Sequence, residues 1–139
     1  MILLDTSGLL AALIRGERDH PRAKAVLEDE RRPLVLSPFV LAELDYFVTR
    51  YLGPPGEARL LDEVARDVYS LADFGADEVR EAAAVIDAHP DLEIGLADAS
   101  LVVLAGRYDT DRVLTLDERH FRALRTPAGK PFTILPADA

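Results

Sequence analysis

The sequence of 139 residues contains no cysteine, and only two of its 16 basic residues, Lys24 and Lys130, are lysines. Without cysteine, the chain cannot form disulfides, use a thiol nucleophile or bind a metal ion through thiolates. It also lacks any apolar stretch close to the roughly 18 residues that a membrane-spanning helix needs. Met1 leads straight into an apolar segment, without the basic region of a signal peptide. We therefore expect a cytoplasmic location.

Two nucleotide-binding signatures are also missing, namely a phosphate-binding loop and a dinucleotide-binding fingerprint. Positive charge is scarce, since the formal net charge is −9 at pH 7, and taken alone this argues against binding of nucleic acids. The net charge is a sum over the whole chain, however, and a cluster of acids at one site lowers it even where a basic rim remains. Apart from the two lysines, the basic residues are arginines, whose guanidinium group suits two-point contacts with phosphate.

Short apolar runs alternate with amphipathic segments along a chain that has the usual length of one domain. Continuous apolar runs predict buried strands at residues 1–4, 34–36, 68–71, 112–116 and 132–135. Helical spacing and capping residues predict helices at residues 7–14, 21–30, 39–52, 56–66, 76–88, 96–108 and 118–124. This pattern favours a three-layer α/β domain in which helices flank a mostly parallel central sheet of four to five strands.

Four carboxylates occupy one kind of position in this pattern. Asp5 follows the first apolar run and Asp117 follows the fourth, while Glu43 and Asp98 lie near the starts of two predicted helices. In a parallel sheet these positions share one edge, at the carboxyl ends of the strands, where ligands bind. Carboxylates within a few ångströms of one another cannot all stay ionised without a cation, and oxygen ligands favour Mg²⁺ or Mn²⁺. The sequence therefore predicts a divalent metal site suited to phosphoryl chemistry.

Each acid also has a simpler interpretation. Asp5, Asp98 and Asp117 could each cap a helix, and Glu43 could be a solvated helical residue. The three histidines are too scattered to predict a metal site, and only His120, three residues after Asp117, could approach a phosphate. The metal hypothesis therefore depends on all four acids meeting at one edge of the sheet.

These motifs resemble the PIN-domain family and, more narrowly, the VapC toxins of bacterial toxin–antitoxin pairs. The resemblance extends from Met1 to about Pro136 and rests on the segments Leu4-Asp5-Thr6-Ser7, Ala42-Glu43-Leu44, Leu96-Ala97-Asp98-Ala99-Ser100 and Leu114-Thr115-Leu116-Asp117. It implies a single PIN-like domain over residues 1–136 and a short C-terminal tail at residues 137–139. It further implies a Mg²⁺-dependent endoribonuclease, with Mn²⁺ as a substitute ion, that cleaves RNA phosphodiester bonds by metal-activated water.

The resemblance assigns the acidic quartet of the family to Asp5, Glu43, Asp98 and Asp117. We expect Asp5 and Asp98 to be direct metal ligands, and Glu43 and Asp117 to bind a second ion or to orient water. Hydroxyls beside these acids are expected to hold a carboxylate or a water in place, and they belong to Thr6, Ser7 and Thr115. Four arginines are expected near the acidic edge, where they could contact the RNA backbone: Arg107, Arg112, Arg119 and Arg122.

The resemblance also implies protein partners, namely a small cognate antitoxin and a second copy of the chain in a homodimer. Two apolar surfaces are candidates for the antitoxin contact, although core packing explains them equally well. They comprise Leu9, Leu10, Leu13 and Ile14 in the first helix, and the segment from Phe39 to Tyr51.

Other functions for such a fold fit the sequence less well or remain open. A receiver domain needs a lysine after a late strand, whereas Lys130 precedes the last predicted strand. A haloacid-dehalogenase-type phosphatase needs two aspartates two positions apart, whereas Asp5 is followed by Thr6 and Ser7. The open alternative is a non-catalytic module of the same fold that binds RNA or protein.

Overall fold

The five strands form one sheet in the computed structural model, which describes residues 1–139, and every neighbouring pair of strands is parallel. The strands are β1 (Ile2–Leu4), β2 (Leu34–Leu36), β3 (Ser70–Leu71), β4 (Arg112–Leu114) and β5 (Thr133–Leu135). Their order across the sheet is β3-β2-β1-β4-β5. The prediction of an α/β fold with a parallel central sheet is confirmed, although β3 and β4 are each two residues shorter than predicted.

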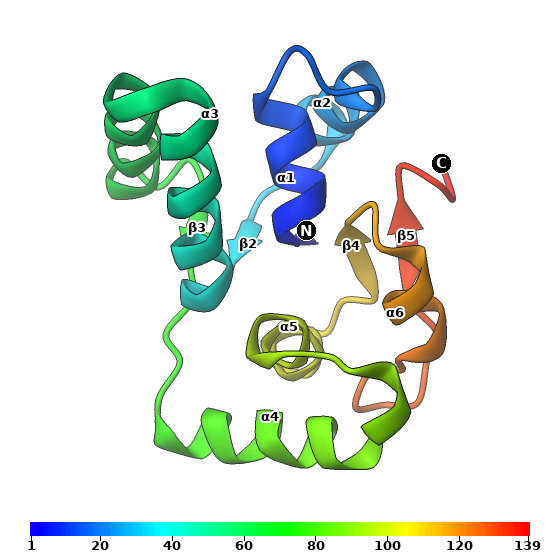
Figure 1. Cartoon of the computed structure of the whole chain (residues 1–139). Coiled ribbons are helices and arrows are strands. Elements are labelled where there is room, and N and C mark those ends of the chain that lie inside the picture. Colours follow the sequence, from blue (N-terminus) through cyan, green and yellow to red (C-terminus); the bar gives the residue numbers. More distant parts are fainter.

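Six α-helices surround the sheet: α1 (Thr6–Leu13), α2 (His20–Asp29), α3 (Pro38–Ala65), α4 (Ala76–Ala88), α5 (Leu96–Tyr108) and α6 (Glu118–Ala123). A single 3₁₀ turn, η1 (Pro90–Leu92), precedes α5. Figure 1 shows α1 beside α2, well apart from the pair formed by α4 and α5. α5 packs against β1 as well as against α4. None of the helices has the length and apolar character needed to cross a membrane.

The strand order reverses its direction once. From β1 the chain proceeds to β2 and β3 on one side, and it then returns to β4 and β5 on the other side of β1. Right-handed crossovers that run in opposite directions place their helices on opposite faces of a sheet. Helices therefore cover both faces, which explains why every residue of β1 and β2 is buried and why their apolar residues do not alternate with polar ones.

α3 is broken at Gly53, whose φ of 71° and ψ of −174° are not helical. Glycine reaches positive φ without the clash that a Cβ would cause. Pro54 and Pro55 follow, and neither can donate a backbone hydrogen bond to the preceding turn. Figure 1 shows the second part of α3 folding back beside the first. The helices predicted at residues 39–52 and 56–66 are thus the two arms of one element.

Gly8 allows α1 to approach β4 closely. A Cβ atom at this position would overlap the backbone carbonyl of Leu114. The same carbonyl oxygen accepts a hydrogen bond from the backbone N–H of Asp5 at 3.0 Å. Because α1 begins directly after β1, this close approach brings the first residues of α1 to the carboxyl end of β4.

The short C-terminal tail, residues 137–139, is held against the domain. The backbone N–H of Asp138 donates a hydrogen bond to the carbonyl of Ile134 at 2.7 Å, and its carboxylate accepts one from the N–H of Ile134 at 2.8 Å. Arg122 forms an ion pair with the same carboxylate at 2.6 Å. Because β5 is an edge strand, these contacts also satisfy backbone groups that would otherwise be free to pair with another chain.

Candidate metal centre

The strand order places β1 next to β4, and these are the two strands at which its direction reverses. The segments that follow such a pair diverge to opposite faces of the sheet and leave a crevice beyond the carboxyl ends of the strands. Asp5 directly follows β1, while Thr115, Leu116 and Asp117 directly follow β4. The first and last predicted acids therefore lie beyond the carboxyl ends of this pair of strands, the position at which ligands bind in folds of this kind.

The carboxylate of Asp5 is held by two hydroxyl groups in a buried setting, since only 5% of the residue is exposed. Its Oδ2 accepts a hydrogen bond from Thr115 at 2.6 Å and another from Ser7 at 3.2 Å. The side chain of Asp5 does not cap α1, so the simpler interpretation of this residue does not describe the structure.

The same two hydroxyls also organise the segment after β4. The Oγ of Ser7 accepts a hydrogen bond from the backbone N–H of Leu116 at 2.9 Å, and the Oγ1 of Thr115 accepts one from the N–H of Asp117 at 2.9 Å. Ser7 and Thr115 are themselves 3.2 Å apart. One network of hydrogen bonds between segments far apart in the sequence therefore joins Asp5 to the backbone of Asp117.

Burial raises the pKa of Asp5 from its ordinary value of 3.8 to about 6. The hydroxyl of Thr115 opposes this rise because it stabilises the ionised carboxylate, whereas the negative charge of Asp98 adds to it. Asp98 belongs to the first turn of α5, far from Asp5 in the sequence. The two acids therefore influence each other through space within one site.

Asp98, Asp117 and His120 form the tightest group of candidate ligand atoms. One oxygen or nitrogen atom from each of them lies within 4.8 Å of the other two. Nδ1 of His120 is 2.8 Å from Oδ2 of Asp117 and 3.5 Å from Oδ2 of Asp98. This nitrogen is buried but has no hydrogen-bond partner, which means that neither carboxylate meets it in a hydrogen-bonding direction. Asp5 and Glu43 are not members of this group.

The electrostatic environment of Asp98 connects all four predicted acids. Burial raises the pKa of Asp98, the nearby His120 lowers it, and the negative charges of Asp117 and Glu43 raise it again. Because Asp98 also raises the pKa of Asp5, each of the four carboxylates acts on at least one other. Such a concentration of negative charge in a partly buried site favours a bound cation.

Glu43 lies on the exposed side of α3 and turns toward the first turn of α1. Its Oε1 accepts a hydrogen bond from the hydroxyl of Thr6 at 2.5 Å.

A buried contact positions α3, which holds Glu43, against α5, which holds Asp98. Ser37 and Ser100 are fully buried and their hydroxyls are 2.7 Å apart. Ser37 is the cap of α3 and Ser100 belongs to the first turns of α5. The sequence pattern gives no sign that these two serines meet.

Asp117 caps α6 with one carboxylate oxygen and approaches His120 with the other. Its Oδ1 accepts a hydrogen bond from the backbone N–H of His120 at 3.1 Å and so caps α6, while its Oδ2 faces the imidazole of His120. The sequence analysis predicted no metal site from the histidines, whereas His120 lies within this group of candidate ligands. Its spacing of three residues from Asp117 was the available signal, because residues three apart on a helix lie on the same side.

Two of the four arginines predicted near the acids have acidic partners elsewhere. Arg107 lies in the last turn of α5, at the opposite end of that helix from Asp98, and pairs with Glu78 at 2.7 Å. Arg122 is tied to Asp138 near the C-terminus. Arg122 also pairs with Glu118 in its own helix at 3.0 Å. Both guanidinium groups are therefore already engaged in ion pairs.

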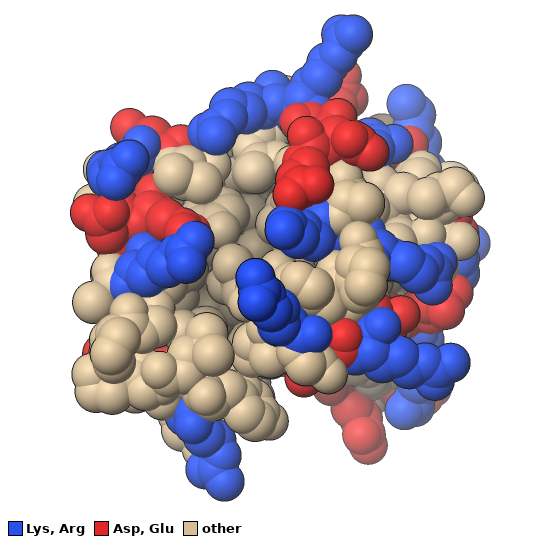
Figure 2. Space-filling view, turned by 90° about the horizontal axis from the view of Figure 1, so that it is seen from above, with Lys and Arg blue, Asp and Glu red and all other residues tan.

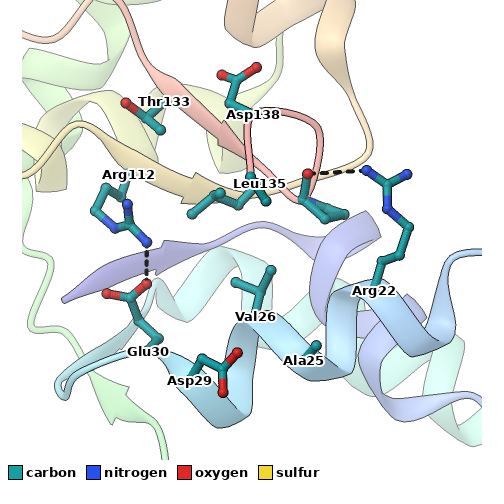
Figure 3. Close-up of a pocket in the computed structure, with 11 residues that line it drawn as sticks. Arg22, Ala25, Val26, Asp29, Glu30, Arg112, Thr133, Leu135 and Asp138 are labelled. Carbon is teal, nitrogen blue, oxygen red and sulfur yellow. Dashed lines mark hydrogen bonds and ion pairs between the residues drawn. The ribbon is translucent and has the colours of Figure 1, made fainter.

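Arg112 was also predicted near the acids, but it begins β4 and so lies at the end of the strand away from Asp117. Arg112 forms an ion pair with Glu30 at 2.6 Å, and both residues line a cavity of about 520 Å³ (Figure 3). Arg22 lines the same cavity and donates a hydrogen bond to the carbonyl of Pro136 at 3.1 Å. None of the four predicted acids lines this cavity. Arg119 is the one predicted arginine that is exposed, lies next to the acidic segment and forms no ion pair.

The donor atoms of this site fit a divalent cation. Asp98 and Asp117 provide carboxylate oxygens that are close together, and the buried Nδ1 of His120 has no other partner. Asp5 adds negative charge from the buried side of the site. Oxygen-rich sites of this kind bind Mg²⁺ or Mn²⁺ in proteins.

Comparisons with known proteins identify the family of the chain. The PIN-domain family matches residues 2–126 of the chain. Ribonuclease VapC26 from Mycobacterium tuberculosis is 44% identical over 135 residues, which cover 97% of this chain and 100% of the relative.

Solved structures show the same fold at low sequence identity. VapC20 from Mycobacterium tuberculosis, described as a toxin that cleaves the sarcin–ricin loop, is 20% identical with a TM-score of 0.78, over 84% of this chain and 90% of that one. VapBC2 from Rickettsia felis, bound to a DNA fragment from its promoter, is 19% identical with a TM-score of 0.66, over 96% and 98% of the chains. A toxin–antitoxin complex from Klebsiella pneumoniae is 20% identical with a TM-score of 0.65, over 89% and 92%. The chain therefore belongs to the PIN-domain family and, within it, to the VapC proteins.

Proposed function

We propose that this protein is a Mg²⁺-dependent endoribonuclease of the toxin type, which hydrolyses phosphodiester bonds in RNA. The observation that carries the proposal is the gathering of acids beyond the carboxyl ends of β1 and β4: Asp98 and Asp117 contribute closely grouped ligand atoms, and the charges of Asp5 and Glu43 act on the same site. A fold that merely bound RNA would gain nothing from this concentration of negative charge, which repels phosphate. The name of the 44% identical relative, ribonuclease VapC26, supports the same activity.

The acids have different parts in this proposal. Asp98 and Asp117 hold the ion, because their oxygens already lie within one small group. Asp5 contributes charge from the buried side, and the hydroxyls of Thr115 and Ser7 keep its carboxylate in one orientation. When bound, Mg²⁺ supplies a Lewis acid that lowers the pKa of water and offsets the charge developing on the phosphate.

Glu43 serves at the exposed side of the site. Its carboxylate is solvent-accessible, and the hydroxyl of Thr6 fixes one of its oxygens. From this position Glu43 can orient a water molecule or accept a proton near the RNA without being buried itself. The roles of Thr6, Ser7 and Thr115 are thus to position carboxylates, which matches the geometry of their hydrogen bonds.

The surface offers positive charge for the RNA backbone despite the net charge of −9. Figure 2 shows lysine and arginine side chains projecting around a hollow near the middle of one face, with acidic side chains beside them. Arg119 is the candidate closest in sequence to the acids, and its guanidinium group is exposed and unpaired. Exposed arginines of this kind favour phosphate contacts that position RNA without reading its sequence.

Incubation of the purified protein with total RNA tests the proposed activity. We expect a discrete set of new RNA ends in the presence of Mg²⁺ and none in EDTA, with activity restored when excess Mg²⁺ is added back. Sequencing of the new ends should find 5′-phosphates, because water attacks the phosphorus and the 3′-oxygen leaves. RNA that is bound but remains uncut under all three conditions would favour the non-catalytic alternative.

We also propose a small antitoxin as a partner of this toxin, since toxin–antitoxin complexes are among the proteins of the same fold. Of the predicted contact residues, Leu9 is fully buried and belongs to the core. The first arm of α3 instead exposes Tyr46 and Tyr51, which are 60% and 57% accessible. Tyr46 meets the ring of Phe47 edge-on, and Tyr51 stacks on it. α1, with the half-buried Leu13, packs against α3 and extends this surface.

Replacement of both Tyr46 and Tyr51 by serine should weaken capture of the purified cognate antitoxin at least about tenfold, because exposed tyrosines are frequent hot spots of interfaces. RNA cleavage by the free variant should stay unchanged. Val79→Ser on α4 is a matched control, since Val79 is also exposed and lies on another helix. Equal capture by all three proteins would exclude this surface.

A homodimer, which we propose for the free protein, is tested by its mass in light scattering.

A further inference from the structure

We propose that His120 is a nitrogen ligand of the metal ion and that it makes the site select Mn²⁺ over Mg²⁺. The inference rests on the metal centre of the proposed function and adds a donor that the acidic quartet does not include. Nδ1 of His120 is buried, lies close to the carboxylates of Asp98 and Asp117, and has no hydrogen bond.

The position of Nδ1 suits a shared cation. Two ligands that bind one small divalent ion at right angles, each about 2.1 Å from it, lie about 3 Å apart. Nδ1 of His120 is 2.8 Å from an oxygen of Asp117 and 3.5 Å from an oxygen of Asp98. Both separations are those of neighbouring ligands, yet Nδ1 makes no hydrogen bond to either carboxylate. The nitrogen thus lies at ligand-to-ligand distance from both carboxylates without a hydrogen bond to either.

The other two histidines show what a structural histidine looks like in this protein. Nδ1 of His20 is 2.8 Å from the carbonyl of Ala11, and Nδ1 of His89 is 2.9 Å from the carbonyl of Val85. Both therefore have a backbone partner, whereas the buried Nδ1 of His120 has only two carboxylates near it and forms a hydrogen bond with neither. A buried polar atom without a partner is costly, and a bound ion would remove that cost.

The local structure holds the imidazole in this place. The backbone N–H of His120 is bonded to Asp117 in the first turn of α6, and the next residue, Phe121, is fully buried in the core. His120 can therefore move little relative to Asp117. Coordination through Nδ1 requires the neutral imidazole, with its proton on Nε2.

An imidazole ligand changes the preference among ions. Mg²⁺ favours oxygen ligands and keeps much of its water, whereas first-row transition ions accept imidazole nitrogen readily. A site with two carboxylates and one imidazole should therefore bind Mn²⁺ more tightly than Mg²⁺. Truncation of the imidazole should cost Mn²⁺ more affinity than it costs Mg²⁺.

Pulsed electron paramagnetic resonance of the protein loaded with Mn²⁺ tests the ligand directly. We expect a ¹⁴N coupling from a directly bound imidazole in the wild-type protein, which changes to ¹⁵N when the histidines are labelled. The coupling should persist in His89→Ala and vanish in His120→Ala and His120→Asn. A bound Mn²⁺ without any nitrogen coupling in the wild-type protein would overturn the inference, and this outcome does not depend on the folding of a variant.

Titration calorimetry with Mn²⁺ and with Mg²⁺ supplies the second measurement. His120→Ala should lower the Mn²⁺ affinity about 10- to 100-fold and the Mg²⁺ affinity clearly less, while His89→Ala should change neither. Equal losses for both ions would contradict the selectivity. Asp98→Asn distinguishes a failure of the His120 ligand from a failure of the whole metal centre. If Mn²⁺ binding needs Asp98 but not His120, only the inference about His120 fails. If the wild-type protein binds no Mn²⁺, the metal centre of the proposed function fails as well.

Discussion

Replacement of Asp98 by asparagine is expected to lower RNA cleavage at least about 100-fold, because loss of one charged metal ligand removes several kcal/mol of transition-state stabilisation. Asp98 is the acid that links the site, since its oxygen lies 3.5 Å from Nδ1 of His120 and its charge acts on Asp5. The asparagine side chain keeps the shape and one oxygen but removes the negative charge. The rate should be measured at saturating and at limiting Mg²⁺, because a weakened site loses more activity when the ion is scarce.

The matched control for this substitution is Asp87→Asn. Asp87 is exposed on α4, and α4 packs against α5, the helix that holds Asp98. The control changes the net charge by the same amount and should leave cleavage within about twofold of the wild-type rate. If Asp98→Asn and Asp87→Asn both cleave RNA as fast as the wild type, Asp98 does not hold the ion and the proposed function is wrong.

Stability of the metal-free protein is expected to fall as the pH rises from about 4 through about 6, which is opposite to the usual behaviour of buried acids in ion pairs. Asp5 has a pKa of about 6 in the folded protein and an ordinary value of 3.8. Between these values the folded state binds more protons than the unfolded state, so the free energy of unfolding decreases with increasing pH. The full effect of Asp5 amounts to about 3 kcal/mol. The raised pKa of Asp98 acts in the same direction.

Thermal or urea unfolding at a series of pH values, with EDTA present, measures this effect. Asp5→Asn should remove most of the dependence and should make the metal-free protein more stable than the wild type at pH 7.5, because no charge is buried. Addition of Mg²⁺ at pH 7.5 should stabilise the wild type, since the ion offsets the charge of the ionised acids. A wild-type protein that is more stable at pH 7.5 than at pH 5 in EDTA would contradict a raised pKa of Asp5.

Much of the fold follows from local patterns that the sequence contains. The helices predicted at residues 76–88 and 96–108 coincide with α4 and α5, because their apolar stripes and flanking loop residues agree. The break at Gly53 was predicted as a helix end, since glycine and two prolines interrupt the hydrogen-bond pattern. The second arm was also predicted, as a helix at residues 56–66, but the local signal could not indicate that this arm folds back beside the first.

The sequence by itself determined the candidate acids and the chemistry that they allow. Asp5, Asp98 and Asp117 were found because a charged residue next to a buried apolar run needs a physical reason. Their type, carboxylate without cysteine, restricted the metal to ions that prefer oxygen. These conclusions depend on residue type and on local spacing, both of which are visible in one dimension.

Only the tertiary structure decided which groups meet. The strand order puts β1 beside β4 and so joins Asp5 to Thr115, and the turn of α6 brings His120 between Asp117 and Asp98. It also removed Arg112 from the site, because that residue begins β4 and the acids follow its end. Contacts between segments far apart in the chain depend on strand order and helix packing, which a pattern of neighbouring residues does not encode.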